Sequence, residues 1–243
     1  MKQHCIKIFI ALIGAALLLT ACKSTKSVDN GQKIVCNCNK AVRVPDKTFR
    51  TFLLDKGYAV KAGWHKMRPT AKGCSLTVLE CFEQGIKSLE GIEMFPQLEQ
   101  VVCSDNPITS LDLNGLPYLK KLYGLNLPLQ DIHIEQCHDL RLIDLSHTKL
   151  DTFDLAPFPN LEEFFCIFTD LRHIDLTPCP SLRLLYIRGT QIREVDLTPC
   201  PSLEKLHARD TPLEKVIVSP EQHKGSVGFN IENGVQVVVT PAP

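Results

Sequence analysis

Two successive stretches of equal length decide the fold: LEEFFCIFTDLRHIDLTPCPS (residues 161–181) and LRLLYIRGTQIREVDLTPCPS (residues 182–202). They carry apolar residues at the same places, and the leucine that opens each stretch recurs every 21 residues along the chain. That column consists of Leu98, Leu119, Leu140, Leu161, Leu182 and Leu203. A fixed period over this many units is typical of a repeat protein, so the repeat is the folding element.

Two further apolar columns keep the same spacing. One lies ten residues into each unit and consists of Ile108, Leu129, Leu150, Leu171, Ile192 and Leu213. The other lies fifteen residues into each unit and consists of Leu113, Ile134, Leu155, Leu176, Leu197 and Val218. One unit cannot bury its own leucines, whereas stacked units turn each column into a continuous row of one shared core. We therefore predict a solenoid of stacked coils.

The typical unit reads L-x-x-L-x-(small or apolar)-x-x-[NT]-x-[LI]-x-x-(apolar)-D-L-x-x-x-P-x, which resembles the leucine-rich-repeat consensus. A second apolar tract, such as Ile174 with Leu176, resembles the short bacterial class of this repeat. Residues 77–106 are similar to the first repeats of internalin-like surface lipoproteins, and residues 44–58 (VPDKTFRTFLLDKGY) resemble their N-terminal cap helix. The resemblance implies an α/β-type repeat solenoid, mostly β, built as a right-handed coil with a small N-terminal helical cap.

The chain departs from this family at two places. The family's cap often carries an Asp-rich stretch like a calcium loop, whereas residues 59–73 contain no Asp or Glu, so no ion of the EF-hand type is expected. The asparagine column starts at Asn106 but continues with Leu127, Thr148, Thr169, Thr190 and Thr211. A threonine hydroxyl bonds the turn backbone less fully than an amide does.

The repeat pattern ends after Val218. Asn233-Gly234 lies between two apolar tracts, and because this dipeptide is a strong hairpin signal we predict a C-terminal β-hairpin over residues 227–240 that covers the edge of the last coil. The predicted division is a signal peptide (1–21), a flexible tether (22–34), an N-terminal cap (35–76), leucine-rich repeats (77–218) and a C-terminal cap (219–243).

The N-terminal residues differ from the rest. Lys2 and Lys7 precede an apolar run over residues 8–19. That run is too short to cross about 30 Å of hydrocarbon as a helix and predicts a secretory signal peptide. Its end, LTAC (residues 19–22), resembles the bacterial lipobox, which implies a palmitate-type acylated Cys22 and a lipid anchor in the outer membrane, on its periplasmic side or at the cell surface. The alternative is an ordinary signal peptide followed by a chance cysteine.

Charge and motifs argue against several function classes. The formal net charge is +0, and no stretch concentrates Lys and Arg enough to neutralise a run of phosphates, so nucleic acid is not expected as a partner. No nucleophile elbow, phosphate loop, dinucleotide fingerprint or paired-histidine motif is present, so neither an enzyme, a cofactor nor a metal site is predicted. One outward acidic column is expected to bond nearby backbone, with a bound cation as the alternative: Asp112, Asp154, Asp175 and Asp196.

Apart from Cys5 in the predicted leader and the lipidation site Cys22, the cysteines fall into two groups. Five occupy inward columns and are interpreted as small core residues, with a bridge between the last two as an alternative: Cys103, Cys166, Cys137, Cys179 and Cys200. Four lie outside the regular ladder, in a compartment where disulfides form: Cys36, Cys38, Cys74 and Cys81. One bridge that ties the cap to the first coil is predicted here, through Cys74 or Cys81, because C-x-C and C-x₆-C lack the spacing of a structural zinc finger.

One outward face of the first strand is more apolar than a solvated strand requires. Tyr and Arg surrounded by aliphatic residues are typical of the centre of an interface. The predicted ligand-binding face consists of Tyr123, Leu125, Phe165, Ile167, Tyr186, Arg188, His207 and Arg209. The interpretation is a membrane-anchored recognition module for a protein partner. Glycan or peptidoglycan binding by the same aromatic face and a structural, self-associating envelope protein remain as alternatives.

Overall fold

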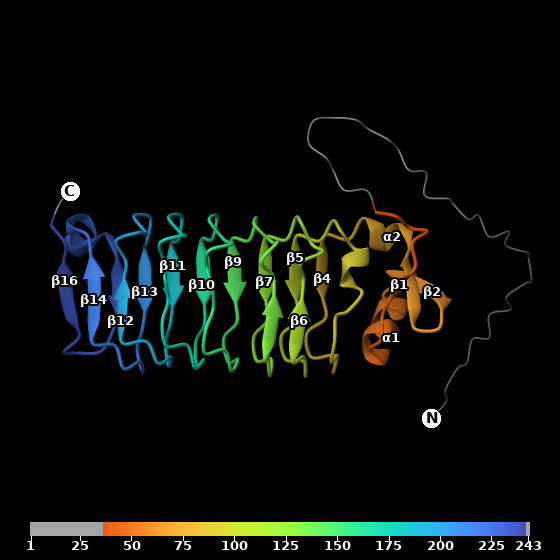
Figure 1. The fold of residues 1–243 in the computed structure, drawn as a ribbon, viewed down its shortest axis with the longest axis horizontal. Helices are drawn as coiled ribbons and strands as arrows, with labels where there is room; N and C mark the ends of the chain where they lie inside the picture. The colour runs from red at the N-terminus through yellow and green to blue at the C-terminus, as the bar shows by residue number, and fades with distance from the viewer. Residues whose placement is uncertain (1–35, 242–243) are drawn as a thin grey trace, which may run out of the picture.

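The computed structural model describes residues 36–241. The predicted signal peptide, the lipidation site Cys22 and the tether lie outside the described residues. The described chain winds into coils that follow one another in sequence order along one axis (Figure 1). Outside the N-terminal cap and two helical turns, its regular structure consists of short parallel strands, so the mostly β repeat solenoid predicted from the 21-residue period is confirmed.

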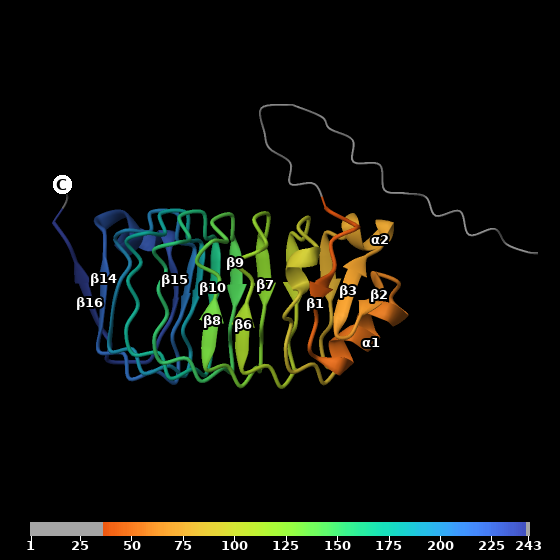
Figure 2. The ribbon, with the colours of Figure 1, turned by 45° about the vertical axis from the view of Figure 1, so that its right-hand side comes forward.

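A small cap opens the described chain, at the end of the stack opposite the C-terminus (Figure 2). It contains β1 (Val42–Arg43), α1 (Lys47–Asp55), β2 (Ala59–Gly63), β3 (Lys66–Pro69) and α2 (Ala71–Cys74), with the strands in the antiparallel order β1-β3-β2. Asp46 begins α1, because one carboxylate oxygen accepts a hydrogen bond from the Phe49 amide at 2.7 Å. Its other oxygen accepts from the Lys87 amide at 3.0 Å. The same carboxylate therefore ties the cap helix to the first coil.

One long sheet runs the length of the solenoid. Its strands are β4 (Val78–Glu80), β5 (Gln100–Val102), β7 (Lys121–Tyr123), β9 (Leu142–Asp144), β10 (Glu163–Phe165), β11 (Leu184–Tyr186), β13 (Lys205–His207) and β15 (Gly228–Asn230). Each neighbouring pair is parallel, and Phe164 pairs with Ile143 on one side and Leu185 on the other. The middle residue of each strand points inward and the two flanking residues point out.

The other side of the coils carries two shorter sheets. One pairs β6 (Ser110–Asp112) with β8 (Asp131–His133), and the other has the order β12 (Glu194–Asp196), β14 (Lys215–Val218), β16 (Gln236–Val239). A 3₁₀ turn, Ile92–Met94, lies in the first coil between β4 and β5, and a π-helical turn, Gln222–Ser226, follows β14.

The apolar columns form one continuous core. Leu119, Leu140, Leu161 and Leu182 all have 0 % exposure, so the leucine column is a single buried row. The second and third columns are also buried, apart from Leu150, which is half-buried. Burial of one leucine side chain contributes about 1.5–3 kcal/mol, so the shared interior is the main source of stability.

The C-terminal segment differs from the expected hairpin. β15 pairs in parallel with β13, and β16 pairs in parallel with β14, so the two strands belong to different sheets. Asn233-Gly234 does lie in a turn, with Gly234 at φ 92°, but that turn leads the chain around a further coil. The physical reason is that the last coil exposes unpaired backbone groups on both sides. One additional coil pairs with the edge strands of both sheets, β13 and β14, whereas a hairpin would cover the edge of only one sheet.

Candidate binding face

The outward residues of the long sheet form rows, because the strands lie in register. The central row consists of Glu80, Val102, Tyr123, Asp144, Phe165, Tyr186, His207 and Asn230. We call this surface the long-sheet face. The register places each member of the row directly beside the equivalent residue of the next coil.

Three rings of the central row lie against one another, and we call them the aromatic row: Phe165, Tyr186 and His207. The Phe165 and Tyr186 ring centroids are 4.9 Å apart at an interplanar angle of 36°. The Tyr186 and His207 centroids are 5.3 Å apart at 65°, an edge-to-face arrangement. All three side chains are half-buried. Aromatic pairs at these separations stabilise each other, so the row is a preformed surface.

Positive groups surround the aromatic row. The Lys205 ammonium lies 5.4 Å from the Tyr186 ring centroid. Arg188 pairs with Asp210 of the next coil at 2.6 Å, and Arg209 lies 3.6 Å from Glu232. The two guanidiniums predicted to contact a ligand are therefore also held by the following coil. These ion pairs are exposed, so each contributes about 0–1 kcal/mol to stability.

Partial burial and the positive charges around His207 lower the pKa of its imidazole. Partial burial of the ring is the first cause, and the positive charges of Arg188 and Lys205 are the next two. Each of these disfavours the protonated ring. His207 is therefore neutral at pH 7 and contributes a polar, uncharged ring to the face.

The predicted face divides into two groups. Phe165, Ile167 and Tyr186 lie together with Arg188, His207 and Arg209 on three consecutive coils. Tyr123 and Leu125 belong to an earlier coil and are half-buried. Between the groups lie Asp144, in the central row, and the buried Ser146.

Tyr123 has an acidic setting that differs from the rest of the face. Burial first, then the negative charges of Glu163 and Asp144, raise the pKa of its hydroxyl. The long-sheet face is therefore acidic near Tyr123 and basic near Tyr186.

Phe168 is a surface residue that sequence reasoning missed. Its ring is 43 % exposed, with the Arg188 guanidinium 5.2 Å from its centroid and the His147 ring 5.1 Å away. Phe168 has φ 53°, a backbone conformation that bulky residues rarely adopt. The Cβ of any side chain at Gly189 would come within 2.3 Å of the Phe168 ring, so glycine there makes room for it.

A signal for Phe168 does exist in the sequence. The corresponding turn position of other coils holds residue types that adopt positive φ more readily: Asp105, Asn126, His147, Gly189 and Asp210. A phenylalanine in this column breaks the local rule, and such strain is a pointer to function. Phe168 adds an exposed ring beside Arg188, next to the long-sheet face.

Two hollows in the described part of the surface lie away from the aromatic row. A groove of about 730 Å³ borders the cap side of the first coils, with Glu90, Glu93 and Asp112 among its lining residues. A smaller one of about 290 Å³ is lined by His133, Phe153 and Asp154, beside the end of β8.

The outward acidic column is explained by local hydrogen bonds. Asp112, Asp154, Asp175 and Asp196 each accept a hydrogen bond from the amide two residues on, at 2.9–3.0 Å. The bonds from Thr177 lower the pKa of Asp175. Backbone bonding, the first of the two readings drawn from the sequence, is therefore what the structure shows.

The core cysteines are free thiols. Cys200 donates to the Cys179 carbonyl oxygen at 3.3 Å, and neither forms a disulfide. Cys81 is also free and buried, whereas Cys74 lies beside Cys36 and Cys38. The bridge therefore involves Cys74 as predicted, but it stays within the cap and does not reach the first coil. No helix in residues 36–241 has the length and apolar character needed to cross a membrane.

Comparison with solved structures identifies the architecture. One match is the functional domain of InlJ from Listeria monocytogenes, which is described as including a cysteine ladder. Its TM-score is 0.54 and its sequence identity 22%, and the match covers 70% of this chain and 41% of the InlJ chain. Internalin C2 of Listeria monocytogenes matches with a TM-score of 0.58 and 22% identity over 81% of this chain and 93% of that chain. No protein-family description matches the sequence. No curated protein matches it either. The leucine-rich-repeat fold predicted from the sequence is confirmed.

Proposed function

We propose that this chain is a lipid-anchored protein of a bacterial envelope whose leucine-rich-repeat solenoid binds a protein partner through the long-sheet face. The observation that carries the proposal is the aromatic row, in which three half-buried rings lie 4.9–5.3 Å apart on consecutive strands. Tyr, Phe and Arg gathered at one place on a rigid surface are typical of a binding hot spot. Solenoids of this kind present extended surfaces of the length a protein partner covers.

The arrangement of the rings favours a protein over a sugar. Glycan recognition uses an aromatic face left open for the sugar ring. Tyr186 has Phe165 on one side, His207 on the other and the Lys205 ammonium 5.4 Å from its centroid. Little of its face is left open, while its edge and hydroxyl remain for polar contacts. Catalysis forms no part of the proposal.

We expect replacement of Tyr186 by alanine to weaken partner capture about 10- to 30-fold, because hot-spot residues contribute about 1.4–2 kcal/mol or more. Phe165→Ala is expected to act in the same direction. The measurement is chemical crosslinking of whole cells that produce the full chain, followed by mass spectrometry of the adducts. Circular dichroism of each purified variant checks that the fold is retained.

A matched control is Trp64→Ala, because Trp64 is the most exposed large apolar residue of residues 36–241, at 88 %, and lies in the cap. Its adduct should be recovered at the level of the unchanged chain. Equal recovery from Tyr186→Ala and the unchanged chain would count against the proposed face. Capture of glycans on an array without any protein adduct, or a dimer in light scattering, would favour the alternatives.

The anchor is tested separately through Cys22, since LTAC (residues 19–22) resembles a lipobox. We expect cells fed an alkyne-tagged palmitate to label the full chain. The Cys22→Ser variant should lose the label and leave the outer-membrane fraction, because stable anchoring needs acyl chains on this cysteine. The control is Cys5→Ser, which changes a cysteine of the predicted leader. Labelling that survives in Cys22→Ser would show that the anchor is elsewhere.

A further inference from the structure

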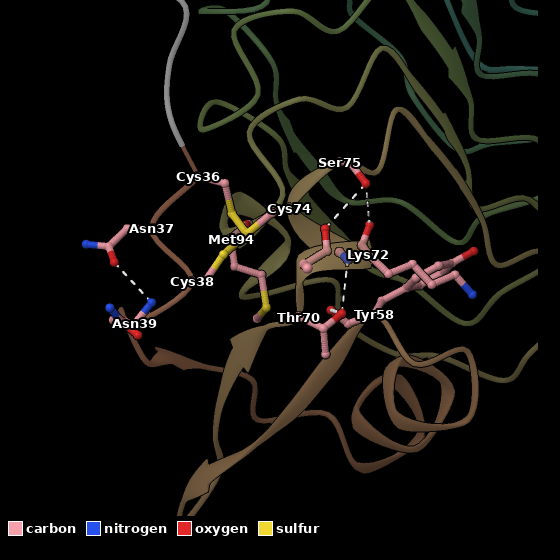
Figure 3. Close-up of a disulfide and its surroundings, with 12 residues drawn as sticks. Cys36, Asn37, Cys38, Asn39, Tyr58, Thr70, Lys72, Cys74, Ser75 and Met94 are labelled. Carbon is pink, nitrogen blue, oxygen red and sulfur yellow. Dashed lines mark hydrogen bonds between the residues drawn. A yellow bond between two sulfur atoms is a disulfide. The ribbon is translucent and has the colours of Figure 1, made fainter. Parts of the chain in front are cut away.

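Three cysteines of the cap meet at one point. The sulfur of Cys74 lies in bonding contact with both Cys36 and Cys38, and all three sulfurs lie within 4.8 Å of one another (Figure 3). A sulfur atom joins only one disulfide at a time. At most one of the two bonds therefore exists at a time, and a disulfide within the trio leaves one cysteine unpaired.

Both pairings fit the backbone. The Cα atoms are 5.3 Å apart for Cys36 and Cys74, and 6.7 Å apart for Cys38 and Cys74. Disulfides occur over Cα separations of about 4.4–6.8 Å, so neither pairing needs the backbone to move. A turn at Asn37 holds the two partners side by side, since Lys40 donates to the Asn37 carbonyl at 3.0 Å. In Figure 3 the side chain of Asn37 points away from the sulfurs, which leaves both cysteines facing Cys74.

Cys74 itself is held in place. Cys74 is the last residue of α2. Thr70 caps the start of this helix, since its hydroxyl oxygen accepts a hydrogen bond from the Gly73 amide at 3.1 Å. The Thr70 hydroxyl also donates to the Gly57 carbonyl at 2.7 Å. A Cβ at Gly73 would come within 2.0 Å of the Tyr58 carbonyl oxygen, so the backbone beside Cys74 fits closely against the cap. Cys74 is the fixed member of the trio.

The trio also differs from the other cysteines in accessibility. Its three members are half-buried, whereas the six free cysteines of residues 36–241 are all buried. Burial raises the pKa of Cys81 and Cys200 to about 12 and that of Cys179 to about 11. Thiolates are the reacting species, so these core thiols are inert at neutral pH. The Cys36 sulfur lies 3.5 Å from the partly buried Met94 carbonyl oxygen, to which its thiol can donate when Cys36 is the unpaired member.

We propose that Cys36, Cys38 and Cys74 form a thiol–disulfide exchange site whose unpaired member forms mixed disulfides with accessible disulfides of other molecules. In the internal step the Cys38 thiolate attacks Cys74 Sγ of the Cys36–Cys74 bond, and Cys36 leaves with the electron pair as a thiolate. One disulfide breaks and one forms, so no oxidant is needed. In the external step the spare thiolate attacks a disulfide R–S–S–R, and a mixed disulfide forms while R–S⁻ leaves.

The experiment maps the cysteines in the full chain without reduction. Native alkylation followed by trypsin, which cuts after Lys33, Lys40, Lys72 and Lys87, yields peptides 34–40 and 73–87. We expect these peptides to be linked in two isomers, Cys36–Cys74 and Cys38–Cys74, each with the alkyl group on the remaining cysteine of peptide 34–40. Without alkylation, an aromatic disulfide that releases a coloured thiolate should modify that same cysteine.

Single variants separate the roles. Cys36→Ser and Cys38→Ser should each keep the link through the remaining cysteine and lose the reactivity of peptide 34–40 toward the aromatic disulfide. The control is Cys81→Ala. Cys81 lies in the same tryptic peptide as Cys74 but is buried, so this variant should keep both the link between the two peptides and the reactivity of peptide 34–40. A single isomer with an inert third cysteine would overturn the proposal. So would three alkylated thiols without a link, or thiols that react only after a chelator is added, which would mark a metal site.

Discussion

Replacement of Phe164 by alanine is expected to lower the free energy of unfolding by about 3–5 kcal/mol, the range for removing a buried aromatic side chain. Phe164 is 1 % exposed, and its ring centroid lies 5.4 Å from that of Phe153. It is the middle residue of β10, between Ile143 and Leu185 of the adjoining coils. The cavity would open in the centre of the stack. Because each coil contacts only its neighbours, a weak coil there uncouples the two ends.

The neighbouring residue supplies the control. Phe165 follows Phe164 directly but points outward on the long-sheet face, where it is half-buried. Phe165→Ala should cost less than about 1.5 kcal/mol, mostly through the lost ring contact with Tyr186. The measurement is urea unfolding followed by circular dichroism for both variants. Equal destabilisation by the two substitutions would show that the inward and outward assignment is incorrect.

Removal of the Asn106 side chain is expected to cost about 3 kcal/mol, because it leaves several buried backbone groups without partners. The Asn106 amide oxygen accepts from the Ile86 amide at 2.9 Å and the Gln84 amide at 3.2 Å. Its nitrogen donates to the carbonyl oxygens of Cys81 and Cys103, each at 2.8 Å. Asn106 is 3 % exposed, so water does not replace these bonds. Asn106→Ala therefore loosens the first coil.

Threonine variants calibrate this prediction. Thr148 occupies the same column and makes one bond, from its hydroxyl to the Leu145 carbonyl at 2.7 Å, so Thr148→Ala should cost about 1 kcal/mol. Asn106→Thr should fall between the two. Urea unfolding gives the free energies, and hydrogen exchange of the Gln84 and Ile86 amides should quicken in Asn106→Ala. A cost for Asn106→Ala no larger than that for Thr148→Ala would contradict the role of the amide.

Some features of the candidate site were predictable from the sequence and others were not. The outward position of Phe165 and Tyr186 follows from strand alternation and the period, and the structure places both where that reasoning expects. The pairing of Arg188 with Asp210 was not foreseen, because it depends on where a side chain of the next coil points. Phe168 was not predicted, because it lies in a turn with positive φ, where strand alternation does not tell which way a side chain points. The cysteine trio was not predictable either, because Cys74 follows Cys36 by 38 residues and Cys38 by 36 residues in a part of the chain without repeats.

The 21-residue period by itself determined the coil, the buried leucine row and the outward row, since each follows from counting along one chain. Only the tertiary structure decided that residues 228–239 continue the coil on both sheets, and that Cys36 and Cys38 meet Cys74. The reason is physical. A repeat places each residue beside its equivalent in the next coil, whereas the two ends of a solenoid have no next coil. Their contacts depend on how nonrepeating segments close over exposed backbone and apolar surface.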